Sequence, residues 1–473
     1  MNAAFQFFRC LLGGFCIALP IVLKAELPPP VLSALSQSPV TAEQMSLWVA
    51  PVDGGDTLLD FNSDRLRQPA SVTKVVTTGT GLLLLGKDYR WKTEFYTNGP
   101  VKDGALHGDL LIRGYGNPYQ VEEALKTMVS EIQRRGLTAI DGQVILDNSY
   151  FIDTHRSAFT FDGKGLEPYN AIPDALTINF KTIDLIIDGV NRQPTVTTEP
   201  KLSKTTIVNR LKRSVAKKCR GQGFSPHLEV DKIARTIVVS GKVSSACRKV
   251  KMTKVLVDAG DLFYSHFKRA WQLQGGEPLP NRWQYGHKQS QYQLFYRAFS
   301  KPLSEQIRAM NKWSNNLMTR QLFLTIGAEI TQPPSTLEKS RAVVMEKLKQ
   351  LGIDATGAYI DNGSGLSRRT RFSAQQLGKF LQAMHHSDLA SDFKRSLSIA
   401  GVDGTLRRRM KNTPLSGSVI GKTGTLRQVK SVAGYLTSAQ GKEYVYVMLF
   451  NGPNARSGGP LMDNILQWIY NNF

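Results

Sequence analysis

The sequence reads Gln68-Pro-Ala-Ser-Val-Thr-Lys74 at the point that decides its fold, and an apolar run to Leu85 follows before Gly86. The Pro-Ala start and the closing glycine predict the two ends of a helix. Because the run is apolar almost all round, we expect a buried central helix. Ser71 and Lys74 would share one face at its N-terminus, where free N–H groups and the helix dipole favour negative charge. A hydroxyl nucleophile, an amine able to take its proton and part of an oxyanion site therefore fall within one helical turn.

The Ser-x-x-Lys spacing alone has little value, because it also occurs at Ser214/Lys217, Ser265/Lys268 and Ser391/Lys394. Two later motifs single out Ser71. Ser314-Asn-Asn316 is the only Ser-x-Asn in the chain, and Lys422-Thr-Gly424 is the only Lys-Thr-Gly. The three motifs follow in the order found in serine penicillin-binding proteins and β-lactamases, which indicates acyl transfer to a serine.

The N-terminus indicates export. Arg9 precedes an apolar run from Cys10 to Leu23 that is short for a bilayer span and contains Pro20. We therefore predict that residues 1–25 are a secretory signal peptide, cleaved after Ala25, and that the protein is periplasmic. An uncleaved membrane anchor is the alternative.

Removing this leader leaves Cys219 and Cys247 as the only cysteines. Two cysteines in an exported chain predict one disulfide, with two unpaired thiols as the alternative. Closing a loop of about 29 residues would stabilise the fold by roughly 3–4 kcal/mol on the chain-entropy model.

The net charge of +22 favours a polyanionic partner. Export and the absence of a nucleic-acid motif argue against DNA or RNA. A cell-wall polymer carrying carboxylates fits better, and a peripheral contact with an anionic membrane stays open, as does charge that serves only solubility. The seven histidines show no metal-ligand spacing. The adjacent pair His385-His386 is interpreted as exposed, so we expect neither a metal nor another cofactor.

The chain is long enough for two or three domains. Residues 45–50 and 56–61 flank Asp53-Gly-Gly55 and predict a β-hairpin. We also expect a strand over 140–147, consecutive antiparallel strands over 418–425, 429–436 and 444–451, and a final helix over 461–470. About 240 residues separate Ser71 from Ser314, far more than adjacent site elements need. We therefore divide the chain into a first catalytic part (26–90), inserted domains (91–295) and a second catalytic part (296–473).

The chain resembles the class C low-molecular-mass penicillin-binding proteins, which are D-alanyl-D-alanine carboxypeptidases/endopeptidases with a large insertion after the Ser-x-x-Lys motif. The stretches that carry the resemblance are Gln68–Lys74, Ile140-Asp-Gly-Gln-Val144, Asp361-Asn-Gly-Ser-Gly-Leu-Ser-Arg368, Ala400-Gly-Val-Asp-Gly-Thr405 and Gly421-Lys-Thr-Gly424. The resemblance implies an α+β fold of the penicilloyl-transferase type, an antiparallel sheet flanked by helices, with inserted β-rich and α/β domains. One departure is Asn315, where many members carry Asp.

The chemistry of acyl transfer assigns provisional roles to these motifs. Ser71 would attack the carbonyl between two D-alanines, and Lys74 would accept its proton if the amine is neutral. Moving the pKa of a lysine from about 10.4 toward 7 takes roughly 4–5 kcal/mol. Ser314 would relay a proton to the leaving nitrogen, and Asn316 would hold Lys74 and the substrate amide.

The third motif would hold the other end of the substrate. Lys422 and Thr423 would meet the terminal carboxylate, while Gly424 would keep the strand open to the extended peptide. As the resemblance implies, the backbone N–H groups of Ser71 and Thr425 would form the oxyanion hole.

We thus expect a serine-type D-Ala-D-Ala carboxypeptidase or DD-endopeptidase that acts on peptidoglycan stem peptides and is acylated by β-lactams. A serine β-lactamase is one alternative; class C β-lactamases put Tyr where Ser314 stands, and the chain shows no Glu-x-x-Leu-Asn loop of the class A kind. A non-catalytic wall-binding or sensor protein is the other. The sequence does not separate cleavage of a terminal bond from cleavage of a cross-link.

Overall fold

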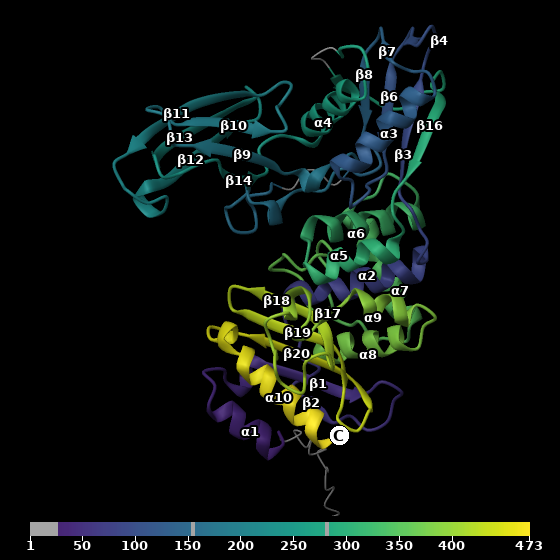
Figure 1. Cartoon of the computed structure of the whole chain (residues 1–473). Coiled ribbons are helices and arrows are strands. Elements are labelled where there is room, and N and C mark those ends of the chain that lie inside the picture. The colour runs from purple at the N-terminus through teal and green to yellow at the C-terminus, as the bar shows by residue number, and fades with distance from the viewer. Residues whose placement is uncertain (1–26, 153–156, 280–282) are drawn as a thin grey trace, which may run out of the picture.

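The computed structural model describes residues 27–152, 157–279 and 283–473 (Figure 1). The predicted signal peptide, residues 1–25, lies outside the described residues. Within the described ranges, no helix is long and apolar enough to cross a membrane.

The lower part of the molecule is built on one antiparallel sheet with strand order β17-β18-β19-β20-β1-β2 (Figure 1). Its strands are β17 (Ser398–Ile399), β18 (Val419–Leu426), β19 (Val429–Thr437), β20 (Glu443–Asn451), β1 (Met45–Pro51) and β2 (Leu59–Phe61). The predicted hairpin and the three predicted C-terminal strands are confirmed. Because β1 pairs with β20, the two ends of the chain complete one sheet.

Helices cover both faces of this sheet, because side chains of successive strand residues point to opposite sides. Val445, Val447 and Leu449 of β20 belong to the apolar core that includes α8. The alternate residues Tyr446 and Met448 pack into the core under α10. The first face carries α2 (Thr73–Leu85), α5 (Leu303–Lys312), α6 (Asn316–Thr331), α7 (Leu337–Gln350), α8 (Ala374–His385) and α9 (Ala390–Ser396). The second carries α1 (Pro29–Ser36) and α10 (Gly459–Asn472).

Helix α2 is the buried central helix that the sequence predicts, with every residue from Thr73 to Leu82 buried. Its glycines allow neighbouring helices to approach. A Cβ on Gly79 would lie 2.7 Å from the Phe380 ring of α8, and one on Gly81 would lie 3.1 Å from Leu322 of α6. Helix α2 therefore packs closely against both α8 and α6, and this packing fixes the position of its first turn.

The inserted region forms the upper part of the molecule (Figure 1). A five-stranded sheet has the order β15-β8-β6-β3-β16, and α3 (Glu122–Arg134) and α4 (Ala259–Leu273) pack with it in one apolar core. Its strands are β3 (Lys92–Thr97), β6 (Leu110–Gly114), β8 (Val144–Asp147), β15 (Trp283–Tyr285) and β16 (Gln293–Phe299). The proposed boundary at residue 295 falls inside β16, which pairs with β3, so we move the end of the inserted region to Phe299.

The prediction of one strand over 140–147 is wrong. β7 (Ala139–Ile140) pairs with β5 (Ala105–Leu106) in a small sheet that also holds β4 (Val101–Lys102), whereas β8 pairs with β6. The chain changes sheets at Gly142, where a Cβ would collide with the Gly108 carbonyl. An alternation of apolar residues cannot reveal such a switch between two sheets.

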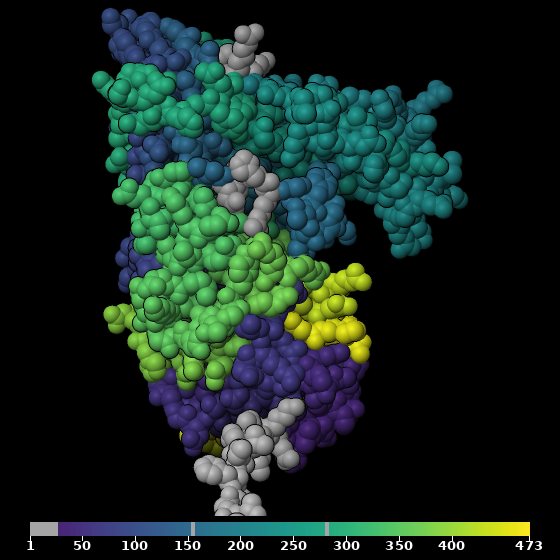
Figure 2. Space-filling view, turned by 180° about the vertical axis from the view of Figure 1, so that it is seen from behind, coloured from purple at the N-terminus to yellow at the C-terminus, as the bar shows by residue number. Residues whose placement is uncertain are grey.

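A smaller β unit extends sideways from the upper part, as Figures 1 and 2 both show. It consists of two three-stranded sheets, β10-β9-β14 and β11-β13-β12. The strands are β9 (Ile183–Asp188), β10 (Thr195–Glu199), β11 (Thr206–Ser214), β12 (Phe224–Asp231), β13 (Thr236–Ser244) and β14 (Val250–Lys254). Cys219 and Cys247 form the predicted disulfide at one end of this unit.

Candidate active site

The buried amine of Lys74 joins three segments of the chain. Its side chain has no exposed surface. The Nζ atom lies 3.1 Å from Ser71 Oγ and donates to Asn316 Oδ1 at 2.7 Å and to the Ser364 carbonyl at 2.6 Å. Ser71 comes from the turn before α2, Asn316 begins α6, and Ser364 lies in the loop before α8. The structure thus brings the first and second motifs into one constellation.

The surroundings of Lys74 favour its neutral form. Burial lowers the pKa of Lys74 well below its ordinary value, and the positive charges of Lys422 and Arg320 lower it further. A neutral amine has two N–H donors and one lone pair. The Ser364 carbonyl and Asn316 Oδ1 only accept hydrogen bonds, so the two donors go there. In this neutral form the lone pair of Lys74 would face the Ser71 hydroxyl, which is the arrangement that a general base requires.

Asn316 is oriented by a contact that the sequence did not predict. Its Nδ2 donates to the Tyr169 carbonyl at 3.2 Å, so its Oδ1 turns to Lys74. Tyr169 belongs to the inserted region. The inserted region therefore helps to orient the Asn316 side chain in the site.

Ser71, the predicted nucleophile, lies on a strained turn. Ser71 is in a single 3-10 turn, Ala70–Val72, directly before α2, and Ala70 has a left-handed φ of 48°. The Ala70 carbonyl accepts from Thr73 Oγ1 at 2.8 Å, and Ser431 Oγ of β19 donates to the Pro69 carbonyl at 2.6 Å. Contacts on both sides thus hold the Ser71 backbone in place.

Strand β18 lies directly against this turn. A Cβ on Gly424 would lie 2.6 Å from the Pro69 carbonyl and 2.9 Å from the Ser71 nitrogen, and it would collide with Ser431 Oγ. The sequence explanation for this glycine, room for the substrate, is therefore incomplete, because the glycine first allows β18 to pack on the nucleophile turn. Thr425, the next residue, is exposed on the strand.

Lys422 is the second fully buried amine. Its Nζ donates to the Thr423 carbonyl at 2.8 Å, and burial lowers the pKa of Lys422 to about 7. The Thr423 hydroxyl donates to Thr405 Oγ1 at 2.8 Å. Thr405 is in turn fixed by its own N–H, which donates to Ser398 Oγ at 3.1 Å.

Ser314 sits between α5 and α6 with a left-handed φ of 56°. No hydrogen bond joins its hydroxyl to Ser71, to Lys74 or to any other residue that the structure describes. Asn315 caps α6, since its Oδ1 accepts from the Met318 N–H at 3.0 Å. Asp and Asn cap helices about equally well, which explains why Asn315 can replace the Asp of many members.

The sequence pattern that defines the D-Ala-D-Ala carboxypeptidase 3 (S13) family matches residues 30–471. The chain belongs to the S13 family. The D-alanyl-D-alanine carboxypeptidase DacB of Haemophilus influenzae is 24% identical over 93% of this chain and 92% of that protein.

Solved structures share the fold of this chain. Penicillin-binding protein 4 of Haemophilus influenzae superposes with a TM-score of 0.79 at 22% identity, covering 93% of this chain and 98% of that one. The same protein in complex with a β-lactam gives 0.76 at 21% identity, covering 93% and 99%. A predatory peptidoglycan endopeptidase of Bdellovibrio bacteriovorus gives 0.52 at 16% identity, covering 90% and 92%. The expected α+β penicilloyl-transferase fold is therefore confirmed.

Sequence reasoning missed four residues that complete the S13 site. Two of them lie in stretches used only to identify the family: Ser364 in Asp361–Arg368, and Thr405 in Ala400–Thr405. The Tyr169 carbonyl carries no side-chain signal, and it reaches the site only because the inserted region folds back on α6, where Arg320 Nη1 donates to the Ala171 carbonyl at 3.0 Å. Arg320 lies on α6 one helical turn after Asn316, a spacing that could have found it.

A cavity of about 360 Å³ adjoins this S13 site. One wall comes from the inserted region and includes Phe161 and Asn170, while the other includes Arg320, Asn362 and Arg368. The Arg368 guanidinium lies 5.1 Å from the centre of the Phe161 ring and donates to the Arg427 carbonyl at 3.1 Å.

Substituting Gly424 tests the packing of β18 on the nucleophile turn. We expect Gly424→Ala to lower the rate of Ser71 acylation by about 100-fold, because displacement of a reacting group by about 1 Å has that effect. Stopped-flow measurement with a chromogenic β-lactam would give the rate. An unchanged rate would show that the contact with Pro69 and Ser71 does not position the nucleophile. Gly459→Ala at the start of α10, where a Cβ would lie 3.9 Å from its nearest neighbour, is the control and should leave the rate unchanged.

Proposed function

We propose that this S13 chain is a peptidoglycan DD-peptidase that forms an acyl-enzyme on Ser71. Membership of the family makes it a serine-type D-Ala-D-Ala carboxypeptidase. The observation that carries the proposal for this site is the buried Lys74 amine, which is bonded to Asn316 and Ser364 and turned toward the Ser71 hydroxyl.

In the proposed acylation step, the Ser71 Oγ–H bond gives its proton to Lys74 while Oγ attacks the carbonyl carbon of the penultimate D-alanine. The oxyanion forms between the backbone N–H groups of Ser71 and Thr425. The packing of Gly424 on the Ser71 nitrogen supports this pairing, because it brings β18 to the nucleophile turn. The proton on Lys74 is then passed to the leaving nitrogen, the oxyanion collapses to the carbonyl of the acyl-enzyme, and the C–N bond breaks.

We assign the proton transfer to the leaving nitrogen to Ser314. Its hydroxyl has no hydrogen-bond partner among the described residues and precedes Asn316, which holds Lys74. A hydroxyl can accept and donate at once, so it can pass the Lys74 proton on. Water would then cleave the acyl-enzyme by the reverse route.

Lys422 and Thr423 would bind the terminal carboxylate of the substrate, and the exposed edge of β18 would pair with its extended backbone. Because burial lowers the pKa of Lys422 to about 7, both the charged and the neutral amine are populated at neutral pH. A bound carboxylate favours the charged form. The Thr405–Thr423 hydrogen bond fixes the hydroxyl beside it.

The shape of the site bears on whether the enzyme cleaves the terminal D-Ala-D-Ala bond, the cross-link between stem peptides, or both. The site is bordered by a cavity rather than a closed wall on the Asn362 side. We therefore propose that the enzyme accepts both a stem peptide ending in D-Ala-D-Ala and a D-Ala–mDAP cross-link. Digestion of purified uncross-linked and cross-linked muropeptides, with chromatography of the products, gives the ratio.

Penicillin labelling tests the nucleophile. After incubation with penicillin, mass spectrometry is expected to find one adduct on the peptide that carries Ser71 and none in Ser71→Ala. No adduct in the wild-type chain would favour a wall-binding or sensor protein, and an adduct that survives Ser71→Ala would place the nucleophile elsewhere. Rapid turnover of penicillin would favour a β-lactamase.

We also propose export through residues 1–25 to the periplasm. The apolar run behind Arg9 and the Cys219–Cys247 disulfide support it, since disulfides persist in oxidising compartments. The intact mass of the protein recovered from a periplasmic fraction should correspond to a chain that begins at Glu26. A mass that retains residues 1–25 would indicate an uncleaved anchor.

A peripheral membrane contact is supported by the charge of the β9–β14 unit. Residues 183–257 hold 16 lysines and arginines against 5 acidic residues, a net charge of +11 out of the chain's +22. The end of this unit at Asp231 borders a cavity against the body, so the opposite end, with the disulfide, faces away. Nine exposed cations gather at that far end: Arg192, Lys212, Arg213, Lys217, Lys218, Arg220, Lys242, Arg248 and Lys249.

The far end suits an anionic lipid surface better than a cell-wall polymer. The stretches 210–228 and 240–250 contain no acidic residue. Val215 is fully exposed in the middle of the cations. An apolar side chain within a basic cluster can enter the headgroup layer, and each Lys or Arg near such a surface contributes about 1 kcal/mol.

Sedimentation with lipid vesicles tests this contact. The chain is expected to sediment with phosphatidylglycerol vesicles at low salt and not with phosphatidylcholine vesicles. Replacing Lys217, Lys218 and Arg220 with glutamine should weaken binding at least about 10-fold, given about 1 kcal/mol for each charge. The matched control replaces Lys347, Lys349 and Lys379 on α7 and α8. Equal loss in both triple variants would mean that only net charge matters.

A further inference from the structure

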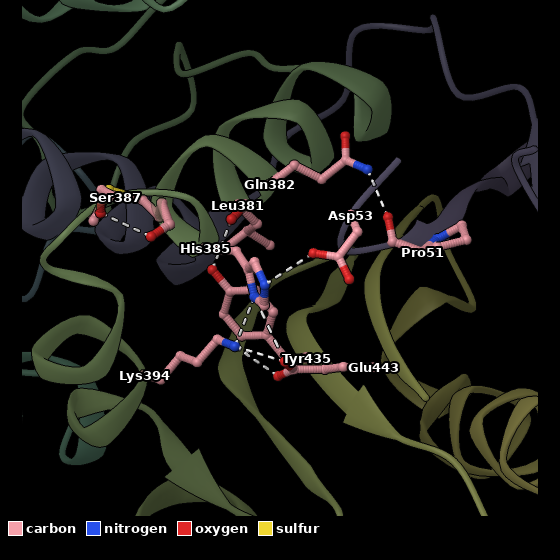
Figure 3. Close-up of polar contacts among 10 residues, drawn as sticks. Pro51, Asp53, Leu381, Gln382, His385, Ser387, Lys394, Tyr435 and Glu443 are labelled. Carbon is pink, nitrogen blue, oxygen red and sulfur yellow. Dashed lines mark hydrogen bonds and ion pairs between the residues drawn. The ribbon is translucent and has the colours of Figure 1, made fainter. Parts of the chain in front are cut away.

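A second cluster of side chains, which could bind a metal ion, includes Asp53 and His385 (Figure 3). None of the proposed catalytic residues belongs to it. Asp53 is in the turn between β1 and β2, His385 ends α8 and His386 follows it. One ligand atom of each lies within 4.8 Å of the others. In the part of the chain that the structure describes, this is the only group of three His, Cys, Asp or Glu side chains that meets that spacing.

His385 is held between two carboxylates and a lysine (Figure 3). Its Nδ1 accepts from Lys394 Nζ at 2.8 Å and lies 3.5 Å from Glu443 Oε2. Its Nε2 faces Asp53 Oδ1 at 3.5 Å. Lys394 also donates to both Glu443 oxygens, at 2.8 and 2.7 Å. The expectation of an exposed histidine pair is therefore only half right, because His386 is exposed but the His385 side chain is 19% exposed.

We propose that Asp53, His385 and His386 bind one divalent transition-metal ion, with Zn²⁺ as the reference ion. Two imidazoles and one carboxylate are a donor set that zinc and its neighbours accept, with water completing the coordination. The two segments are already fixed to each other, since Gln382 of α8 donates to the Pro51 carbonyl at 2.8 Å.

The hydrogen bonds of His385 show which ring nitrogen could bind an ion. Nδ1 accepts from Lys394, so Nε2 is the nitrogen that faces Asp53 and the proposed ion.

Metal binding then requires the other ring tautomer, with the lone pair on Nε2 and the proton on Nδ1. Solvent takes the proton from Nε2 and supplies one to Nδ1, so the number of protons on the ring is unchanged. The Lys394 hydrogen bond to Nδ1 is lost, the new Nδ1–H would donate to Glu443, and Lys394 would keep its two bonds to the same carboxylate. Glu443 thereby becomes the outer carboxylate that orients a metal-bound histidine.

The geometry needs only a small closure. Donor atoms about 2.0–2.2 Å from a zinc ion lie roughly 3.5 Å apart, the present separation of Asp53 Oδ1 and His385 Nε2, so only His386 must approach, by about 1 Å. Asp53 and His386 are exposed and free to move. Gly54 and Gly55 behind Asp53 have φ of 89° and 108° and no neighbours that a Cβ would meet, so the turn can adjust. A bound ion would fasten the β1–β2 turn to α8.

Calorimetric titration of the untagged full-length protein with ZnCl₂, after removal of metals by a chelator, tests the site. We expect one saturable site per chain and a rise in the thermal midpoint that grows with zinc concentration. Asp53→Asn and His386→Ala should each lower the affinity at least about 10-fold. Glu443→Gln should lower it about 10- to 100-fold, as expected for an outer partner.

His107→Ala is the matched control. His107 is also a surface histidine beside one carboxylate, with Nδ1 2.6 Å from Asp141 Oδ2, but it has no third ligand among the described residues. Its variant should bind zinc like the wild type. Acylation of Ser71 by penicillin should be unchanged in every variant, which shows that each is folded. The absence of saturable binding, or equal affinity in Asp53→Asn, His386→Ala and the wild type, would overturn the proposal.

Discussion

Lys74→Met is expected to lower the rate of Ser71 acylation by about 10²- to 10⁴-fold, the range that a general base contributes. The variant replaces the buried amine with an apolar side chain of similar length, so the packing of α2 is kept. What is lost is the lone pair directed at the Ser71 hydroxyl. Rapid-mixing measurement of acylation by a chromogenic β-lactam gives the rate.

Lys74→Arg separates proton transfer from charge. Arginine keeps a positive charge at all accessible pH values and cannot accept a proton. If Lys74 acts as the base, Lys74→Arg should be as slow as Lys74→Met. Substantial acylation by the arginine variant would instead mean that the residue serves mainly as a cation. In the wild type, acylation should rise with pH through the lowered pKa of Lys74, because only the neutral amine accepts the proton.

Lys422→Met should have two large and opposite effects. Cleavage of a peptide that ends in D-Ala-D-Ala should fall by about 100-fold or more, chiefly through a higher KM, because the terminal carboxylate loses its cation. The free energy of unfolding at pH 7 should rise by up to about 4 kcal/mol, since a lysine with a pKa near 7 disfavours folding relative to one at 10.5. Thermal unfolding and steady-state kinetics on the same sample measure both.

The sign of the pH effect follows from proton binding. The pKa of Lys422 is lower in the folded chain than in the unfolded one, so the unfolded chain binds more protons between pH 7 and 10.5. The Lys422 contribution to stability therefore rises as pH rises through that window and is constant below it. The difference in midpoint between Lys422→Met and the wild type should shrink over this range. A difference that does not depend on pH would mean that Lys422 is not a buried, titrating amine.

The sequence predicted most of what lies in local patterns. Motif order singled out Ser71, and the apolar run behind it predicted a buried helix, which α2 is. Alternating residues and turn glycines predicted the hairpin at Asp53 and the three C-terminal strands. The cysteine count predicted the disulfide. These succeed because helix, strand and turn preferences act over a few residues.

Contacts between segments far apart in the chain could not be predicted from the sequence. The carbonyls of Ser364 and Tyr169 show no side-chain signal, yet they orient Lys74 and Asn316. The break between β7 and β8 and the packing of Gly424 on the nucleophile turn depend on which strands become neighbours.

The sequence by itself determined the family and the class of reaction and predicted Ser71 as the nucleophile, because these reside in short motifs whose residue types are tied to their reaction. Only the tertiary structure decided that the Lys74 amine lies 3.1 Å from Ser71 Oγ and that Asp53 lies beside His385. Both depend on burial and on distances across hundreds of residues, which folding sets and no local pattern encodes.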